Sequence, residues 1–221
     1  MRRLSTIVIF ALLALLSWGQ RVDYGARMSK AGLVDLSTLG PGITICLKYA
    51  TTDNFTHKNM YGDFRCAYLI KPAAESLRKA LKQLRAINPD YGFIIYDAAR
   101  PLSVQQKMWN AVRGTVGQRY VAPPRRGGPH NYGVAIDISL TYKGHPMDMG
   151  TPFDTFTIDA HITNEPLLVK QGRISQQAMR NRQLLRKVLT DNGFMTYSRE
   201  WWHFERYRVG YARRHFVLLN F

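Results

Sequence analysis

The stretch GGPHNYGVAIDIS (Gly127–Ser139) says most about the fold. From Val134 onward apolar residues alternate with small or polar ones, a period of two that is typical of a β-strand. Asp137 falls between two small residues on the face opposite the apolar row, where a carboxylate could face a cleft. Gly133 permits a sharp turn before the strand, which would bring His130 back toward Asp137. The stretch therefore predicts an imidazole beside a carboxylate, both supported by a strand.

A second imidazole and a second carboxylate lie close together in the run EWWH at residues 200–203. Glu200 and His203 are three residues apart, so on a regular strand they face opposite sides, and a turn or bulge is needed for both to serve one cleft. Two imidazoles and one carboxylate are usual protein ligands of a catalytic zinc, with the fourth position left to water. His130, Asp137 and His203 are therefore candidate zinc ligands. Glu200 remains as the base that such a water needs.

Each of these signals is weak when it is taken alone. A single buried histidine or a carboxylate at a strand end is more typical of a structural role than of a ligand. The other four histidines, His57, His145, His161 and His215, lack a carboxylate at ligand spacing and are interpreted as loop or surface residues. The hypothesis of a zinc site rests on the occurrence of both motifs, GGPHNYGVAIDIS and EWWH, in one chain.

Length and charge limit the class of protein. The 221 residues are enough for one folded domain with a substantial core. Lys and Arg number 31 against 15 Asp and Glu, a net charge of +16 that suggests anionic neighbours such as nucleic acid, membranes or acidic polymers. The sequence has no Lys/Arg block with interleaved aromatic residues and no helix-turn-helix or zinc-finger spacing. We therefore expect no nucleic-acid partner and interpret the charge as a generally basic surface.

The N-terminus has the pattern of an export signal. Arg2 and Arg3 precede the apolar run Ile7–Leu16, and small residues suitable for cleavage follow. The run is far shorter than the ~20 residues that a spanning helix needs. We interpret residues 1–20 as a signal peptide and residues 21–221 as one domain. The expected location is periplasmic or extracellular, with no membrane span after cleavage; an uncleaved anchor is the alternative.

Periodicity predicts the main elements of the domain. Predicted helices cover Pro72–Asn88, Pro101 to about Arg113, and Gln176–Asn192. Predicted strands cover Ile43–Tyr49, Gly92–Tyr96, Val134–Leu140, Phe194–Tyr197, Trp201–Tyr207 and His215–Leu219. Three helices mixed with several short strands joined by tight turns favour an α+β fold, with the zinc cleft on a largely antiparallel sheet.

The two cysteines, Cys46 and Cys66, lie on either side of a predicted loop. Export would permit a disulfide between them. A buried free thiol is equally normal at Cys46, which falls in a predicted strand. The sequence leaves the pairing open.

Six segments, in order along the chain, resemble the zinc-dependent D-alanyl-D-alanine dipeptidases. They are YATTDNFT (Tyr49–Thr56), YDAARP (Tyr96–Pro101), PHNYGVAID (Pro129–Asp137), MGTPFD (Met149–Asp154), GF (Gly193-Phe194) and EWWHFE (Glu200–Glu205). His, six residues, Asp and a later Glu-Trp-Trp-His are specific to the wider group of zinc D,D-peptidases that cut cell-wall peptides. The first and fourth segments narrow the resemblance to the dipeptidase branch.

The resemblance implies one zinc ion per chain, D-Ala-D-Ala or a related cell-wall dipeptide as substrate, and roles for seven residues. His130, Asp137 and His203 would be the zinc ligands, Glu200 the general base, Arg100 the cation that stabilises the transition state, and Tyr49 and Asp154 the groups that hold the free amino end. Arg100 also stands at a predicted strand-to-helix junction, which would aim its side chain from a rigid support.

The chain departs from the family pattern at two positions. Gly128 stands where the family usually has a serine, two residues before the first histidine, and Ala99 stands where it usually has an aromatic residue. Neither change removes a ligand or the base, but both bear on how the substrate is held.

Two other functions stay open at this point. One is a zinc D,D- or L,D-carboxypeptidase that trims longer cell-wall peptides, which differs from a dipeptidase in leaving the cleft open at the amino end of the substrate. The other is a catalytically inactive, zinc-holding cell-wall binding module. The presence of Glu200 argues against the second, since a pure metal site does not need it.

Overall fold

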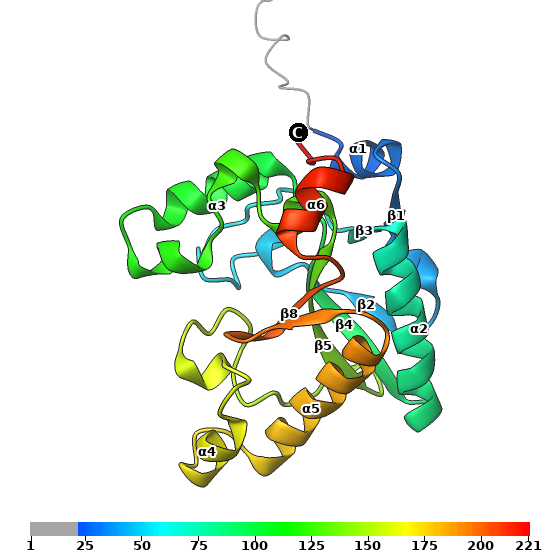
Figure 1. Cartoon of the computed structure of the whole chain (residues 1–221), viewed down its shortest axis with the longest axis vertical. Helices are drawn as coiled ribbons and strands as arrows, with labels where there is room; N and C mark the ends of the chain where they lie inside the picture. Colours follow the sequence, from blue (N-terminus) through cyan, green and yellow to red (C-terminus); the bar gives the residue numbers. More distant parts are fainter. Residues whose placement is uncertain (1–21) are drawn as a thin grey trace, which may run out of the picture.

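A mostly antiparallel sheet of six strands runs through the molecule (Figure 1). Its spatial order is β2 (Ile43–Ile45), β4 (Tyr91–Asp97), β5 (Ala135–Tyr142), β8 (Glu200–Glu205) and β7 (Met195–Tyr197), and β6 (His145–Pro146) pairs with β5. Within this sheet, β2 and β4 are parallel and the other pairings are antiparallel. A separate antiparallel pair joins β1 (Leu33–Asp35) to β3 (Tyr68–Ile70). The predicted α+β class with a largely antiparallel sheet is therefore confirmed.

This computed structural model describes residues 22–221, so the expected signal peptide at residues 1–20 lies outside the described part. The α-helices of residues 22–221 are α1 (Tyr24–Lys30), α2 (Lys71–Ile87), α3 (Leu102–Val112), α4 (Glu165–Lys170), α5 (Gln176–Asp191) and α6 (Val209–His215). Short 3-10 helices are η1 (Leu36–Leu39), η2 (Lys48–Ala50), η3 (Val116–Tyr120), η4 (Pro124–Arg126), η5 (Pro129–Tyr132) and η6 (Ile158–Ala160). Over the same residues, no helix combines the length and the apolar character needed to cross a membrane.

The two longest helices cover one face of the sheet. Helices α2 and α5 pack against each other, and they contact β4, β5 and β8 (Figure 1). The leucine row of α2 faces inward, because Leu77, Leu81 and Leu84 are buried. Helix α3, with η3 and η4 beside it, stands apart from this pair (Figure 1). The three predicted helices are thus confirmed, with ends that agree to within a residue or two.

Three short helices were not predicted. Helices α1, α4 and α6 have six or seven residues each. Segments of that length are marginal as isolated helices and show too few turns for a periodic pattern, so tertiary packing has to stabilise them.

The predicted strand His215–Leu219 is wrong. His215 is the last residue of α6, and the chain beyond it is irregular. Its backbone groups are satisfied by loops rather than by a strand: the Leu219 amide donates to the Asn131 carbonyl at 2.9 Å, and the Leu102 amide donates to the Leu219 carbonyl at 2.8 Å. The C-terminal chain therefore bridges η5 and the start of α3. The apolar residues of this segment do not by themselves distinguish such loop contacts from pairing in a β-sheet.

The predicted strand at the first cysteine is shorter than expected. Strand β2 ends at Ile45, and η2 takes the chain away from the sheet before the predicted end at Tyr49. Cys46 therefore lies just beyond β2, where its amide donates to the Ile95 carbonyl at 2.9 Å. Cys46 and Cys66 are both free thiols in this structure, and Cys66 is exposed.

Strand β5 is the central support of the site. Each of its residues from Ala135 to Thr141 is buried, because both of its edges are paired and both faces are covered. The predicted alternation is present, but it separates one packed face from another, not core from solvent. A side chain such as Asp137 is consequently held on rigid backbone.

Candidate active site

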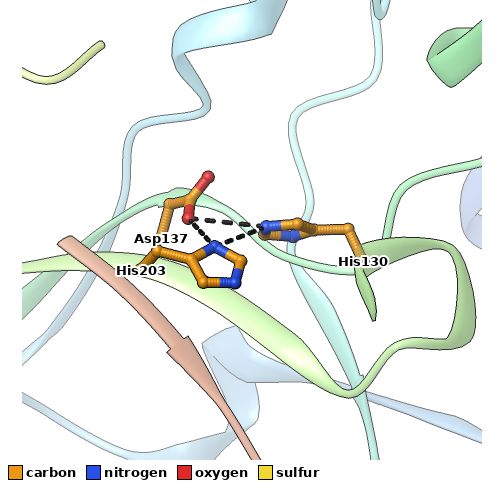
Figure 2. A group of neighbouring side chains, drawn as sticks. All are labelled: His130, Asp137 and His203. Atoms are coloured by element: carbon orange, nitrogen blue, oxygen red, sulfur yellow. Dashed lines mark hydrogen bonds and ion pairs between the residues drawn. The ribbon is translucent and has the colours of Figure 1, made fainter. Parts of the chain in front are cut away.

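Three buried side chains converge on one point (Figure 2). His130 Nε2 lies 3.4 Å from Asp137 Oδ1 and 3.2 Å from His203 Nδ1, and the last two atoms are 2.9 Å apart. Tetrahedral ligands at 2.0–2.1 Å from a zinc ion are separated from one another by about 3.3 Å. The three donor atoms therefore fit a single metal ion, and the cluster is a candidate metal centre.

Backbone geometry brings these residues together. Asp137 and His203 are direct partners in the antiparallel pairing of β5 with β8. Gly133 ends η5 in the left-handed region, with φ of 65°, so the chain reverses and returns His130 toward Asp137. A Cβ at residue 133 would also lie 3.0 Å from the Leu33 side chain. The turn predicted at Gly133 is present in the structure.

The outer nitrogen of each imidazole has its own acceptor. His130 Nδ1 donates to the Ala98 carbonyl at 2.7 Å, and His203 Nε2 lies 3.5 Å from Glu205 Oε1. Acceptors at these positions select the tautomers that leave His130 Nε2 and His203 Nδ1 free to bind a metal. The sequence analysis missed Glu205, although it follows His203 by two residues and so shares its face of the strand.

The surroundings of His203 favour positive charge. Burial lowers the pKa of His203, but its hydrogen bonds to Asp137 and Glu205 outweigh burial and raise the pKa to about 10. The imidazoles of His130 and His203 hold the pKa of Asp137 well below its usual value, although burial alone would raise that pKa. A cation bound between these groups would be stabilised by the same carboxylates.

The Glu200 side chain lies close to the His130, Asp137 and His203 cluster because the pairing of β8 with β7 is irregular at the start of β8. Thr196 of β7 pairs with Phe204, whereas Tyr197 pairs with Glu200, so the register shifts between the two pairs. This irregularity supplies the bulge that residues three apart require, and Glu200 Oε2 lies 4.0 Å from His203 Nδ1. Burial raises the pKa of Glu200 to about 7. A carboxylate with that pKa can accept and return a proton near neutral pH.

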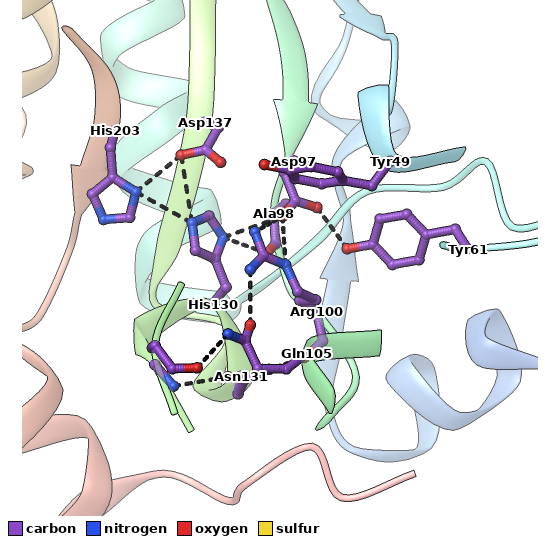
Figure 3. Close-up of polar contacts among 12 residues, drawn as sticks. Tyr49, Tyr61, Asp97, Ala98, Arg100, Gln105, His130, Asn131, Asp137 and His203 are labelled. Carbon is purple, nitrogen blue, oxygen red and sulfur yellow. Dashed lines mark hydrogen bonds and ion pairs between the residues drawn. The ribbon is translucent and has the colours of Figure 1, made fainter. Parts of the chain in front are cut away.

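Arg100 is buried, and polar contacts link it to Asp97 and Gln105 (Figure 3). Its Nε donates to Asp97 Oδ2 at 2.9 Å, its Nη2 forms an ion pair with the same oxygen, and its Nη1 donates to Gln105 Oε1 at 2.8 Å. Tyr61 donates its hydroxyl proton to Asp97 Oδ1 at 2.6 Å. Burial alone would lower the pKa of Arg100, but Asp97 outweighs burial and the pKa is raised. The guanidinium is thus permanently charged and fixed in direction.

Asp97 and Gln105 hold the Arg100 guanidinium, and neither was predicted from the sequence. Asp97 is the last residue of β4 and precedes Arg100 by three positions, so an acidic residue at the strand end was an available signal. Gln105 lies one turn into α3, and no local pattern distinguishes it from other polar helix residues.

Tyr49 and Asp154 come together from segments 105 residues apart. The Tyr49 hydroxyl donates to Asp154 Oδ1 at 2.8 Å, and the Phe55 amide donates to Asp154 Oδ2 at 3.2 Å. Asp154 has φ of 62°, a left-handed conformation that Asp adopts more readily than most residues. Burial raises the pKa of Asp154 well above its usual value and outweighs the hydrogen bonds from Tyr49 and Phe55, and the negative charges of Asp137 and Glu200 raise this pKa further.

One cavity of about 630 Å³ brings the candidate site residues together. The seven residues singled out from the sequence line it: Tyr49, Arg100, His130, Asp137, Asp154, Glu200 and His203. Its apolar wall includes Phe55, Met108, Trp109, Phe156 and Trp202. A concave site with apolar walls and a few convergent polar groups is typical of a small-molecule site.

The two departures from the family pattern have structural explanations. A Cβ at Gly128 would lie 2.9 Å from the Ala122 Cβ, so a serine there would require the loop to move. Ala99 is buried in a small cluster with Met28, Tyr68 and Leu219 and is not among the cavity-lining residues. The first change alters the wall of the cavity, and the second lies outside it.

A buried His-Asp-His cluster that could hold a metal ion, with the Glu200 carboxylate beside it in one cavity, is the arrangement of a metal-dependent hydrolase. A family model described as D-ala-D-ala dipeptidase matches residues 29–220. The chain therefore belongs to the D-ala-D-ala dipeptidase family, and the resemblance seen in its motifs is confirmed.

Curated relatives agree with this assignment. The D-alanyl-D-alanine dipeptidase of Escherichia coli (strain K12) is 37% identical over 176 residues, which cover 78% of this chain and 83% of that protein. The protein of the same name from Enterococcus faecium is 31% identical over 195 residues, covering 78% of this chain and 90% of that protein. Another protein of that name, from Enterococcus faecalis (strain ATCC 700802 / V583), is 28% identical over 194 residues, which cover 79% of this chain and 91% of that protein.

Replacing Glu205 tests whether the outer acceptor supports the metal centre. We expect Glu205→Ala to weaken metal binding by about 10–100-fold, because loss of such a partner frees the tautomer and rotation of a ligating imidazole. Competition with a chromophoric chelator measures the affinity. Glu75→Ala, an exposed site on α2, is the matched control and should bind metal as the unaltered protein does. Equal affinity in both variants would contradict the role given to Glu205.

Proposed function

We propose that this protein is a zinc dipeptidase that hydrolyses D-alanyl-D-alanine to two molecules of D-alanine. The observation that carries the proposal is the position of Asp154, a half-buried carboxylate held by Tyr49 in the cavity that also contains the candidate metal centre. Such a carboxylate suits a free ammonium group. The names of the relatives, which describe D-alanyl-D-alanine dipeptidases, support the same substrate.

Zinc is the proposed metal. His130, Asp137 and His203 would supply two nitrogens and one oxygen, the donor set of a three-ligand catalytic zinc site with a fourth position for water or substrate. When bound, zinc would polarise the scissile carbonyl and lower the pKa of a water molecule. The buried donors and their fixed tautomers are consistent with this choice.

Glu200 is proposed to move the proton. It would accept a proton from the attacking water and deliver it to the nitrogen of the leaving amino acid, so that one side chain acts first as base and then as acid. Its pKa of about 7, raised by burial, suits both directions of transfer.

Arg100 is proposed to stabilise negative charge on the carbonyl oxygen in the transition state. The guanidinium is held by Asp97 and Gln105 before the substrate arrives, so little reorganisation is required during the reaction. A preorganised donor of this kind typically contributes about 3–4 kcal/mol to the lowering of the barrier. Arginine suits the position because it does not deprotonate and presents a rigid fork.

Asp154 is proposed to select dipeptides over longer peptides. An ammonium at the amino terminus would bring a positive charge to this half-buried carboxylate, whose pKa is raised by burial. A longer peptide has a neutral amide at that point and would leave Asp154 desolvated and unpaired, which adds a penalty to the lost bond. This preference separates the proposal from a carboxypeptidase that trims longer chains. An intact Glu200 in the cavity argues against an inactive binding module.

Export to the periplasm or the exterior is a further part of the proposal, with cell-wall peptides as the source of the dipeptide. It is supported by Arg2, Arg3 and the apolar run Ile7–Leu16. Fractionation of cells that make the full chain, followed by N-terminal sequencing, should return a mature protein that begins near residue 20. A full-length chain in the cytoplasmic fraction would contradict export.

Glu200→Gln separates the base from the ligands. We expect the variant to bind one equivalent of zinc, since Glu200 is outside the ligand set, and to lose about 10²–10⁴-fold in kcat. Metal analysis and dipeptide turnover on the same sample measure both. His203→Ala is the contrasting variant and should lose metal as well as activity. If Glu200→Gln also loses zinc, the roles of base and ligand have been exchanged.

Blocking the amino end tests the role of Asp154. N-acetyl-D-Ala-D-Ala should be cut at least about tenfold more slowly than D-Ala-D-Ala, since a charged hydrogen bond contributes about 1.5–3 kcal/mol. Asp154→Asn keeps the shape and the left-handed backbone but removes the charge. It should narrow the gap mainly by raising KM for the free dipeptide. Equal kcat/KM for blocked and free forms in the unaltered enzyme would favour the carboxypeptidase alternative.

A further inference from the structure

The segment Met149–Asp159, which carries Asp154, is irregular until η6 begins, yet it has to hold one carboxylate in a fixed place. We propose that Arg182, a buried residue of α5, is a positioning residue that holds this segment and thereby sets the selectivity for a free amino terminus. The inference rests on the proposed function, because it assumes that Asp154 binds the ammonium group.

Arg182 binds both ends of the segment. Its side chain has no exposed surface. Its Nε donates to the Met149 carbonyl at 2.6 Å, and its Nη1 donates to the Asp159 carbonyl at 2.9 Å. One guanidinium thus joins two backbone points on either side of Asp154. A planar, rigid group with five donors suits such a bridge better than any other side chain.

The charge of Arg182 is not used mainly for an ion pair. Its neighbouring carboxylate, Glu165, lies 3.8 Å away and instead accepts two hydrogen bonds from Arg186, at 3.0 and 2.6 Å. Burying a guanidinium is costly unless its donors are satisfied. At Arg182 the satisfaction comes largely from the carbonyls of the segment, so removal of the guanidinium would leave those carbonyls without their donor.

A second set of contacts links the segment to β8. The Thr151 hydroxyl accepts from Trp201 Nε1 at 2.8 Å and from Arg182 Nη2 at 3.4 Å. The guanidinium of Arg182 also lies over the Trp201 ring, 5.8 Å from its centroid. Trp201 follows Glu200 directly in the strand. The contacts of Arg182 therefore couple the position of Asp154 to that of the proposed base.

The segment has no room to shift toward α5. Gly150 adopts φ of 78°, and a Cβ there would lie 2.8 Å from the Ile174 Cβ and 3.1 Å from the Ala178 Cβ. The Phe153 ring packs against the rings of Tyr49 and Trp202, with centroids 5.8 and 5.3 Å apart. The motif MGTPFD thus combines two features: its first three residues contact α5, the residue Ile174 before it, or β8, and its last residue lines the cavity.

The test compares two arginines one turn apart on α5. Arg182→Met removes the donors and keeps much of the volume, whereas Arg186→Met removes the other partner of Glu165 and is the control. We expect Arg182→Met to lower kcat/KM for D-Ala-D-Ala about tenfold, mainly through KM, and to change kcat/KM for N-acetyl-D-Ala-D-Ala much less. Arg186→Met should leave the ratio of the two substrates unchanged.

A milder variant covers the case in which Arg182→Met does not fold. Thr151→Val removes only the shared hydroxyl and should lower the same ratio about threefold. Hydrogen exchange gives a readout apart from turnover: amides of residues 149–156 should exchange faster in Arg182→Met or Thr151→Val than in Arg186→Met.

Asp154→Asn, measured in parallel, distinguishes a failure of the positioning role of Arg182 from a failure of the proposed function. If Asp154→Asn leaves the substrate ratio unchanged, ammonium recognition by Asp154, and with it the proposed function, is wrong. If Asp154→Asn collapses the ratio while the folded Arg182 or Thr151 variant keeps both the ratio and the exchange of residues 149–156, the positioning role is overturned and the proposed function stands. A fall in stability with an unchanged ratio likewise assigns Arg182 a purely structural role.

Discussion

The pairing of β5 with β8 is the constraint on which the site depends. It sets Asp137 opposite His203, and the same ladder sets Ala135 opposite Glu205. Because side chains alternate along a strand, a slip of one residue would turn both His203, a candidate metal ligand, and its outer acceptor Glu205 away from the cavity. The remaining groups are aimed at this fixed point: His130 by the turn at Gly133, and Glu200 by the irregular register of β7 and β8.

The carboxylates with little exposed surface fall into two groups, those with a cationic or imidazole partner and those whose pKa is raised. Only the second group takes part in the proposed recognition of the ammonium group and the proposed proton transfer. Asp97, Asp137 and Glu165 each have a buried or partly buried cationic or imidazole partner. Asp154 and Glu200 lie in the cavity with raised pKa values, because burial outweighs the interactions that favour their charged forms. A half-buried carboxylate without a full counter-charge is unfavourable in the resting protein. In the proposed reaction these are the two that meet the ammonium group and the transferred proton.

The sequence predicted what local patterns encode. Strand alternation and the turn at Gly133 were readable from single segments, as was the need for a bulge between Glu200 and His203. The irregular C-terminal chain was misread, since hydrogen bonds to distant loops decide its conformation. Partners such as Gln105 and Arg182 were not identified for the same reason: each acts through contacts with residues far away in sequence, and its own neighbours carry no signal. Family resemblance, not periodicity, supplied the roles of Tyr49 and Asp154.

The most direct test of the central claim is release of D-alanine by the purified, zinc-loaded protein from two substrates at equal concentration. One is D-Ala-D-Ala, and the other is a pentapeptide that ends in D-Ala-D-Ala. A cavity that places Asp154 at the amino end of a dipeptide should release D-alanine from the first substrate and very little from the second. Equal or faster release from the pentapeptide would contradict the proposed function and favour a carboxypeptidase.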